Sequence, residues 1–375
     1  MQYTKLKSIN EYVSESINPM KLPDTVFEMY SVPIYETGHP EYLKGSEIGS
    51  NKAKVRKNDV LLCKINPRIN RVWVVADESE NQSIASSEWI VIRSSTYNPE
   101  FLAWYFRCPK FKKLMTSEVT GIGGSLTRAQ PKAVAEYPVP VLSKNKQEEI
   151  VNILNRANSI IKFRKQELQK LDNLIKARFV EMFGDEKKLM TMDEVCSIIT
   201  DGTHQPPKFK DTGIPFIFVS NITGDRVTYD AEKFIDQDTY DELIKRTPIE
   251  IGDILLSTVG SYGHTAVVKT NKKFLFQRHI AYLKPKKELV NSDYLHGAIL
   301  SPDAQRQIEK GVKGIAQKTL NLSEIKKMKI PVPSMDRQKA FATFVAQVDK
   351  SKAVIQKSLD EAQLLFDSLM QQYFG

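Results

Sequence analysis

The chain has 375 residues, which is enough for two or three domains. Hydrophobic residues make up 41% and charged residues 26%, as in a soluble globular protein, and the net charge of +9 favours a polyanionic partner. The three cysteines are odd in number and form no C-x-x-C pair, which argues against a disulfide framework or a structural zinc site and fits a reducing cytoplasm.

The first globular part is expected to cover residues 1–142 and to mix short strands with turns. Its first ten residues, MQYTKLKSIN, are polar and lack the apolar core of a signal peptide, so we expect a cytoplasmic protein without a membrane partner. A strand followed by a turn is predicted at 32–38, and further strands rich in valine and isoleucine are predicted at 59–65, 71–77 and 88–94. One helix over residues 98–115 is expected to close this part.

The second segment, residues 143–184, is expected to be one long helix, because it has no proline and no glycine before its final Gly184. Positions taken alternately four and three apart are mostly apolar, which is a coiled-coil pattern. The seam residues are Ile150, Leu154, Ile161, Leu168, Leu171 and Ile175. Asn145 is the candidate N-cap.

The second globular part is expected at residues 185–333 and has the same character as the first. Strands are predicted at 213–219, 252–258, 264–270 and 279–285, and one closing helix is predicted over residues 291–311. The organisation is therefore an α+β part followed by a long helix, and then the same pair again.

The last segment, residues 334–375, is a second long helix by the same criteria, with Asp336 as the candidate N-cap. Its seam residues are Phe341, Val345, Ile355, Leu359, Phe366 and Leu369. The polar interruptions of the two seams do not coincide, as expected for two different strands of one pair. A long intramolecular coiled coil is the preferred interpretation, and a pair of core helices in a bundle is the alternative.

An internal repeat relates the two halves at an offset of about 193 residues. Gly121-Ile122 recurs as Gly314-Ile315, Pro138-Val139-Pro140 recurs as Pro331-Val332-Pro333, and Asn98 recurs as Asn291. After a short deletion Gln147 matches Gln338, and Phe183-Gly184 matches Phe374-Gly375. Several anchors at a nearly constant offset indicate a duplicated unit.

Motifs for catalysis are not found in the sequence. No phosphate-binding G-x-x-x-x-G-K-[ST] loop and no G-x-S-x-G nucleophile elbow occur. The five histidines do not stand at metal-ligand spacing on one helix, so no metal site and no catalytic residue is predicted.

The positive features of the sequence concern binding. Seven basic residues and one acidic residue, Asp59, lie between Lys52 and Arg71. Arginine and asparagine can form paired hydrogen bonds with base edges, and lysine suits phosphates. The second copy offers polar loops after strands, where recognition residues tend to lie. The candidate nucleic-acid contacts are Lys52, Lys54, Arg56, Lys64, Arg68, Arg71, Arg128, Thr203, His204, Lys208, Ser261, Tyr262, Lys313 and Lys318. The alternative is a solvated surface residue for each lysine and arginine, a hydrogen-bonded turn residue for His204, and a packing residue for Tyr262.

The whole pattern resembles the specificity subunit of type I restriction-modification systems. The most specific stretch is residues 138–184, with its Pro-rich step, its Gln-x-x-Ile helix start and its KLDNLIKARFVEMFG end. The stretch DGTHQPPKFKDTGIPFIFVSNI also looks like the start of a recognition domain of that family, whereas the front of the first copy, SESINPMKLPDT, does not match it.

The resemblance implies two tandem α+β target recognition domains, each followed by a long helix, with the helices paired as an antiparallel coiled coil. It implies a non-catalytic subunit that binds a bipartite site in double-stranded DNA. The implied partners are two methyltransferase subunits, which use S-adenosylmethionine, and restriction subunits, which use ATP and Mg²⁺. This chain itself would bind no cofactor.

Two other classes of protein remain as alternatives. One is an enzyme, such as a nuclease, with a fused recognition module; the duplication leaves little of the chain for a separate catalytic domain. The other is a coiled-coil assembly protein without a DNA role.

Overall fold

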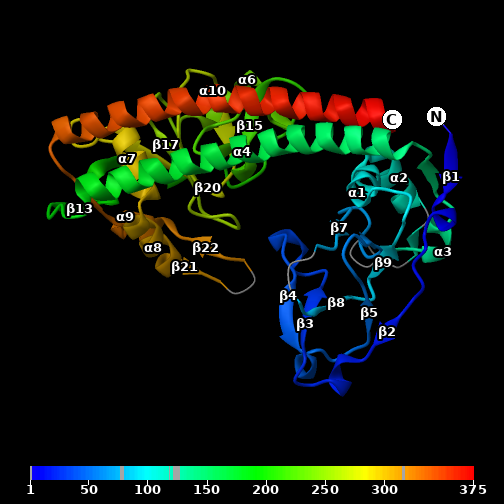
Figure 1. The fold of residues 1–375 in the computed structure, drawn as a ribbon. Helices are drawn as coiled ribbons and strands as arrows, with labels where there is room; N and C mark the ends of the chain where they lie inside the picture. Colours follow the sequence, from blue (N-terminus) through cyan, green and yellow to red (C-terminus); the bar gives the residue numbers. More distant parts are fainter. Residues whose placement is uncertain (1, 77–79, 118, 121–126, 315–316) are drawn as a thin grey trace. The chain divides into compact units, whose positions relative to one another are not determined.

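The computed structural model describes the chain except for residues 1, 77–79, 118, 121–126 and 315–316. It divides into two compact units, and Figure 1 labels many of their elements. Unit 1 comprises residues 1–163 and 358–375, and unit 2 comprises residues 164–357. The repeat anchors Gly121-Ile122 and Ile315 lie outside the described residues.

The part of unit 1 before the long helix is built from short strands and three helices. Its strands are β1 (Tyr3–Lys5), β2 (Ser16–Ile17), β3 (Val26–Tyr30), β4 (Glu41–Lys44), β5 (Lys52–Lys54), β6 (Val60–Cys63), β7 (Val72–Val74), β8 (Gln82–Ala85), β9 (Trp89–Ile92), β10 (Val119–Thr120), β11 (Arg128–Ala129) and β12 (Pro138–Pro140). The helices are α1 (Pro99–Arg107), α2 (Pro109–Ser117) and α3 (Pro131–Val134). A five-stranded sheet has the order β2-β5-β8-β3-β4, and a three-stranded sheet has the order β7-β6-β9.

Unit 2 contains a comparable set of elements. Its strands are β13 (Leu189–Thr191), β14 (Cys196–Asp201), β15 (Ile214–Ile217), β16 (Lys233–Ile235), β17 (Ile254–Ser257), β18 (Thr265–Val267), β19 (Leu275–Phe276), β20 (Ile280–Pro285), β21 (Val312–Lys313), β22 (Thr319–Leu320) and β23 (Lys329–Pro331). The short helices are α5 (Met192–Val195), α6 (Gln237–Leu243), α7 (Ser292–Leu300), α8 (Pro302–Gly311) and α9 (Leu322–Lys327). The sheets have the orders β14-β20-β17-β18 and β16-β15-β19.

The two units share a three-stranded antiparallel core. In unit 1 the buried strand β6 pairs antiparallel with β7 and β9, and in unit 2 the buried strand β17 pairs antiparallel with β18 and β20. The registers correspond, because Val60 faces Val74 and Ile92, while Ile254 faces Val267 and Leu283. The repeat in the sequence is therefore a repeat of structure.

The Pro-Val-Pro steps of the two units lie in the same segment but are displaced by two residues, so the predicted match of Pro138 with Pro331 is wrong: Pro140 pairs with Tyr3 as Pro331 pairs with Leu189. β12 pairs antiparallel with the first strand, β1, and β23 pairs in the same way with β13. Proline has no N–H group to donate a hydrogen bond to a neighbouring strand, and it is tolerated in a two-stranded sheet because each strand is an edge strand. The step therefore joins the beginning and the end of each globular part immediately before its long helix.

The two long helices are present as α4 (Lys144–Phe183) and α10 (Met335–Phe374), each 40 residues and so about 60 Å long. Within unit 2 they run antiparallel, because Asp172 contacts Lys352 at 2.6 Å, Arg178 lies over the Phe344 ring at 5.8 Å, and the Phe183 and Phe341 rings are 5.8 Å apart. The predicted seam residues are all buried or half-buried. Of the helices in the described residues, none has the length and apolar character needed to cross a bilayer.

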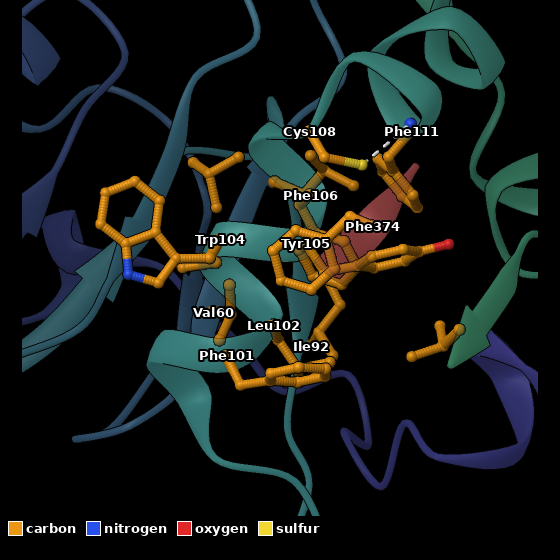
Figure 2. Close-up of a cluster of buried hydrophobic side chains, with 14 of the residues drawn as sticks. Val60, Ile92, Phe101, Leu102, Trp104, Tyr105, Phe106, Cys108, Phe111 and Phe374 are labelled. Atoms are coloured by element: carbon orange, nitrogen blue, oxygen red, sulfur yellow. Dashed lines mark hydrogen bonds between the residues drawn. The ribbon is translucent and has the colours of Figure 1, made fainter. Parts of the chain in front are cut away.

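The end of each long helix packs into a unit that it does not begin in. Phe374, at the end of α10, lies among the core side chains of unit 1 (Figure 2). Its ring centroid is 5.6 Å from that of Phe101 and 5.7 Å from that of Tyr105. Phe183, at the end of α4, lies in the core of unit 2 with its ring 5.0 Å from Tyr294. This arrangement explains why the Phe-Gly ending is part of the repeat.

Several predictions about local structure need correction. The closing helix of each globular part is two helices, because Pro109 and Pro302 each begin a new helix at its first position, where proline is favoured. Residues 32–38 form no strand and instead contain a 3-10 turn, Tyr35–Thr37. The predicted N-caps, Asn145 and Asp336, lie inside α4 and α10, because these helices begin at Lys144 and Met335. In α4 the cap is Ser143, whose hydroxyl accepts a hydrogen bond from the Lys146 amide at 3.3 Å.

Candidate nucleic-acid interface

In unit 1 the loop after β6, residues 64–71, holds three of the candidate residues close to a short hairpin that carries a fourth. The amide of Asn66 donates to the Thr127 carbonyl at 2.8 Å, and the amide of Ala129 donates to the Lys64 carbonyl at 2.9 Å. Ile65 forms a β-bridge with Arg128, which lies on the β10–β11 hairpin. Lys64, Arg68, Arg71 and Arg128 are thus brought to one place.

The conformation of this loop depends on two asparagines. Asn66 and Asn70 have φ of 48° and 55°, a left-handed conformation that asparagine tolerates better than most residues. The two tight turns leave Arg68 and Ile69 exposed at the tip. The sequence pattern singled out the basic residues here, and the asparagines shape the backbone that presents them.

The same loop contains polar atoms that lack partners. Of the buried atoms without a hydrogen-bond partner in the described part of the chain, five lie in this loop or beside it: Asn66 Oδ1, Asn70 Oδ1, Arg71 Nε, Glu88 Oε2 and Thr127 Oγ1. Arg71 Nε does lie 4.0 Å from the Glu36 carboxylate. Leaving a buried polar group unsatisfied is costly, so such a cluster is typical of a surface that is completed by a ligand or by water. Glu88 and Thr127 were not predicted as site residues: Glu88 belongs to no charge cluster or motif, and Thr127 lies in a Gly-rich stretch of the sequence in which only Arg128 was selected.

The remaining basic residues of the 52–71 run lie elsewhere in unit 1. Lys52 is buried on β5, and its amine donates to the Ser50 carbonyl at 3.2 Å. Burial lowers the pKa of Lys52 from its ordinary value. Lys54 lies 3.7 Å from Glu15, and Arg56 is an exposed residue in the turn before β6.

Unit 2 presents an equivalent loop after β17. Residues 257–265 connect β17 to β18, and Val259 forms a β-bridge with Thr319 on the β21–β22 hairpin. This bridge corresponds to that between Ile65 and Arg128 in unit 1. Gly260 and Gly263 have φ of 72° and 84°, which explains why glycine occupies these two positions.

Tyr262 connects this loop to the helix and hairpin beside it. Its hydroxyl donates to Glu309 at 2.6 Å and accepts from Lys318 at 3.4 Å. These hydrogen bonds lower the pKa of Glu309 and raise the pKa of Lys318 relative to their ordinary values. Ser261 is exposed beside Tyr262, and Lys313 is exposed on strand β21.

The loop after β14 emerges at the same end of the four-stranded sheet. β14 and β17 both pair antiparallel with β20 and end opposite its first residues, Asp201 at Ala281 and Ser257 at Ile280. Thr203, His204 and Lys208 follow β14 directly. The exposed His204 contacts Asp201 at 2.8 Å, and Asp201 also binds Arg246 at 2.6 Å. The unit 2 candidates in these loops therefore lie at one end of the sheet.

A cavity of about 470 Å³ lies elsewhere in unit 2, between the helices and the globular part. Its charged lining includes Lys269 paired with Asp293 at 2.5 Å and Lys352 paired with Asp172 at 2.6 Å. Within the residues that the structure describes, no group of three or more His, Cys, Asp or Glu side chains is arranged to hold a metal ion.

These features define a class of protein: a duplicated α+β chain in which each unit presents a polar loop bridged to a hairpin, with two long helices shared between the units. Residues 184–364 match the family model described as the type I restriction modification DNA specificity domain. The match covers 181 of the 375 residues, and the relatives below are described as specificity subunits of type I restriction enzymes.

The chain is 28% identical over 170 residues to the specificity subunit of the type I restriction enzyme EcoBI from Escherichia coli, covering 45% of this chain and 36% of that protein. It is 22% identical to the putative MjaX specificity subunit from Methanocaldococcus jannaschii, covering 51% of this chain and 46% of that protein. The MjaVIII specificity subunit from the same organism is matched at 18% identity over 84% of this chain and 78% of its own length. The chain thus matches less than half the length of the first two relatives.

Solved structures share the fold of the whole chain. A chain from a structure concerning complex assembly and conformational transition of the type I R-M system has a TM-score of 0.57 at 19% identity, with 100% of this chain and 97% of that chain covered. The type I S subunit from M. genitalium has a TM-score of 0.55 at 13% identity, with 100% and 96% covered. At these identities the likeness concerns the fold.

Proposed function

We propose that this chain is the non-catalytic DNA-binding subunit that directs a type I methyltransferase, and its restriction subunits, to a bipartite target. One observation carries the proposal: each unit presents the same loop-and-hairpin surface, bridged at Ile65–Arg128 in unit 1 and at Val259–Thr319 in unit 2, but with different side chains. Two surfaces with the same backbone arrangement and different side chains are suited to binding two half-sites of different sequence.

The paired helices supply the distance between the half-sites in this proposal. α4 and α10 form an antiparallel coiled coil that acts as a spacer between domains 1–142 and 185–333, with the helices covering residues 143–184 and 334–375. A rigid spacer raises the effective concentration of the second binding event only when the half-sites are correctly spaced. Phosphate contacts supply affinity, and base contacts supply specificity.

The implied partners are two methyltransferase subunits, which carry S-adenosylmethionine, and restriction subunits, which use ATP and Mg²⁺. The helices offer a surface for them in unit 1, where four large apolar side chains are exposed: Ile160 at 46%, Phe163 at 64%, Leu364 at 73% and Leu365 at 54%. Exposed apolar groups that cluster on an otherwise polar surface favour a protein interface.

The experiment is a methylation assay with purified methyltransferase subunits, with and without this chain. We expect adenine methylation of a bipartite duplex only when both are present. Methylation or cleavage by this chain alone would favour the enzyme alternative, and equal methylation of duplexes lacking either half-site would contradict a role in recognition.

We expect Leu364→Asp to weaken methyltransferase binding at least tenfold without unfolding the chain, because Leu364 is 73% exposed. The matched change Leu359→Asp places a charge in the seam, where Leu359 is 9% exposed, and is expected to lower stability as well. Leu168→Asp tests the half-buried seam of unit 2 in the same way.

Size-exclusion chromatography with the methyltransferase measures the loss of binding, and thermal unfolding measures the loss of stability. Unchanged binding of the Leu364 variant would show that this face is not part of the interface.

We expect Arg68→Ala to weaken binding through the half-site read by unit 1 and to leave the other half-site unaffected. A lost base contact would cost about 1–3 kcal/mol, and a lost phosphate contact would reduce the salt slope by about one. Lys208→Ala is the matched change in unit 2 and should affect the opposite half-site. Fluorescence anisotropy over a salt series, with duplexes altered in one half-site at a time, makes the distinction. Equal loss on both duplexes for either variant would contradict the assignment.

A further inference from the structure

Each unit contains a buried glutamine at the point where the long helix leaves the globular part. Gln147 in α4 is 1% exposed, and Gln338 in α10 is 0% exposed. A fully buried amide must have its hydrogen bonds satisfied locally, because water cannot reach it. The partners of these amides are therefore informative about their role.

In unit 1 the amide of Gln147 connects three segments. Its Oε1 accepts from the backbone amide of Asn98 at 2.8 Å, and its Nε2 donates to the Leu142 carbonyl at 2.9 Å and approaches the Thr96 carbonyl at 3.5 Å. Asn98 is the N-cap of α1, where its side chain accepts from Glu100 and Phe101. The glutamine thus ties the start of a core helix to the residue just before the long helix.

Unit 2 repeats this arrangement atom for atom. Gln338 Oε1 accepts from the Asn291 amide at 2.9 Å, and Nε2 donates to the Pro333 and Leu289 carbonyls, both at 3.0 Å. Asn291 is the N-cap of α7 and accepts from Asp293 and Tyr294. We call the two sets of contacts the Gln147 junction and the Gln338 junction.

The chemistry of these junctions requires an amide at both positions. One oxygen faces a donor and one nitrogen faces two carbonyls, so glutamate would place a carboxylate against carbonyl oxygens and leucine would leave all three groups without a partner. Hydrogen bonds are directional, whereas the surrounding apolar contacts, such as those of Phe101 and Phe374, fix distance better than angle.

We propose that Gln147 and Gln338 are positioning residues that fix the angle of each globular part on its long helix, and thereby set the spacing of half-sites that the protein accepts. The inference rests on the proposed function for its consequence at DNA. The residues touch no DNA in this scheme and act through the loops that they orient. The junction occurs twice because each of the two globular parts has its own angle to its long helix.

The first test measures methylation of duplexes that carry both half-sites at the optimal spacing and at one or two base pairs more or fewer. We expect the wild-type complex to favour the optimal spacing by about 100-fold over a change of one base pair, since misplacement by ångströms costs about that much. Gln147→Leu and Gln338→Leu are each expected to reduce this preference to less than about tenfold. Gln169→Leu is the control, because Gln169 is exposed on α4 and bonds only within the helix, to Asn173.

An unchanged preference for spacing in both leucine variants would overturn the proposal, as would a uniform loss of methylation at every spacing. A variant that loses its fold by circular dichroism would also overturn it, because the amide would then be required for folding rather than for positioning. A wild-type complex that methylates no bipartite duplex would instead overturn the proposed function.

A second test needs no DNA and so separates the two proposals. Fluorescent labels on Tyr42→Cys in β4 and Lys162→Cys in α4 report the distance between the globular part and the helix within unit 1, because both sites are exposed and the three native cysteines are buried. We expect Gln147→Leu to broaden the single-molecule distance distribution at least twofold, and Gln169→Leu to leave it unchanged. Equal widths in the wild type and the Gln147 variant would contradict a positioning role.

Discussion

Phe341→Ala is expected to lower the free energy of unfolding of unit 2 by about 3–5 kcal/mol. Phe341 is 0% exposed, and its ring lies 5.4 Å from Phe179, 5.8 Å from Phe183 and 6.2 Å from Tyr294. Gly297 of α7 lies against the same ring, since a Cβ at this position would come within 2.6 Å of it. The cavity left by the substitution would therefore be lined by rigid groups that cannot close it.

The control for this prediction is Phe344→Ala. Phe344 is half-buried and contacts Arg178 through its ring face at 5.8 Å, so its loss should cost about 1 kcal/mol. Hydrogen exchange read by mass spectrometry follows the amides of unit 2 directly. Equal protection in the two variants would show that the Phe341 cluster does not hold α10 to the globular part.

Asp59→Ala is expected to destabilise unit 1 by about 3 kcal/mol, because it leaves a guanidinium without its partner. Asp59 is 1% exposed and receives two hydrogen bonds of 2.7 Å from Arg93, whose side chain is 19% exposed. It also accepts from the Arg56 amide at 2.9 Å. The partial exposure of Arg93 places the effect at the lower end of the range for buried pairs.

Tryptophan fluorescence during urea unfolding measures this effect in unit 1, because the chain's three tryptophans, Trp73, Trp89 and Trp104, all lie there. Glu149→Ala is the matched control: Glu149 pairs with Lys146 at 2.7 Å on the surface of α4, where an ion pair contributes about 0–1 kcal/mol. A midpoint for Asp59→Ala no lower than that of the control would contradict the prediction.

The sequence was sufficient to predict the long helices and the duplication. The seam positions of α4 and α10 are buried or half-buried, because spacing by four and three keeps one face of a helix inward over many turns. The strands β6 and β17 were also found at their expected places, since continuous apolar runs bounded by turn residues mark buried strands.

Tertiary contacts between distant residues were not predictable from the sequence. Position 104 in unit 1 is Trp104 and its counterpart in unit 2 is Gly297, while Ile150 corresponds to Phe341. In unit 2 the large ring of Phe341 is on the long helix and α7 has a glycine beside it. In unit 1 the large ring, Trp104, is on α1, and the long helix has the smaller Ile150. An alignment of the two halves scores both positions as mismatches.

The candidate site was predicted less completely than the fold. Charge clustering located the loop at residues 64–71, but it also included Lys52, which is buried on β5. It gave no indication of Glu88 and Thr127, whose buried atoms lack partners in this loop. The predicted role of each basic residue at DNA remains a prediction, because recognition depends on the geometry of the bound duplex.

The most direct test of the central claim, that one chain reads two half-sites at a fixed spacing, is methylome sequencing of a host that expresses this chain with its methyltransferase subunit. We predict a single bipartite motif, with two specified halves separated by a spacer of constant length and unspecified sequence, and methylated adenine in each half. An undivided motif, or a spacer of variable length, would contradict the account.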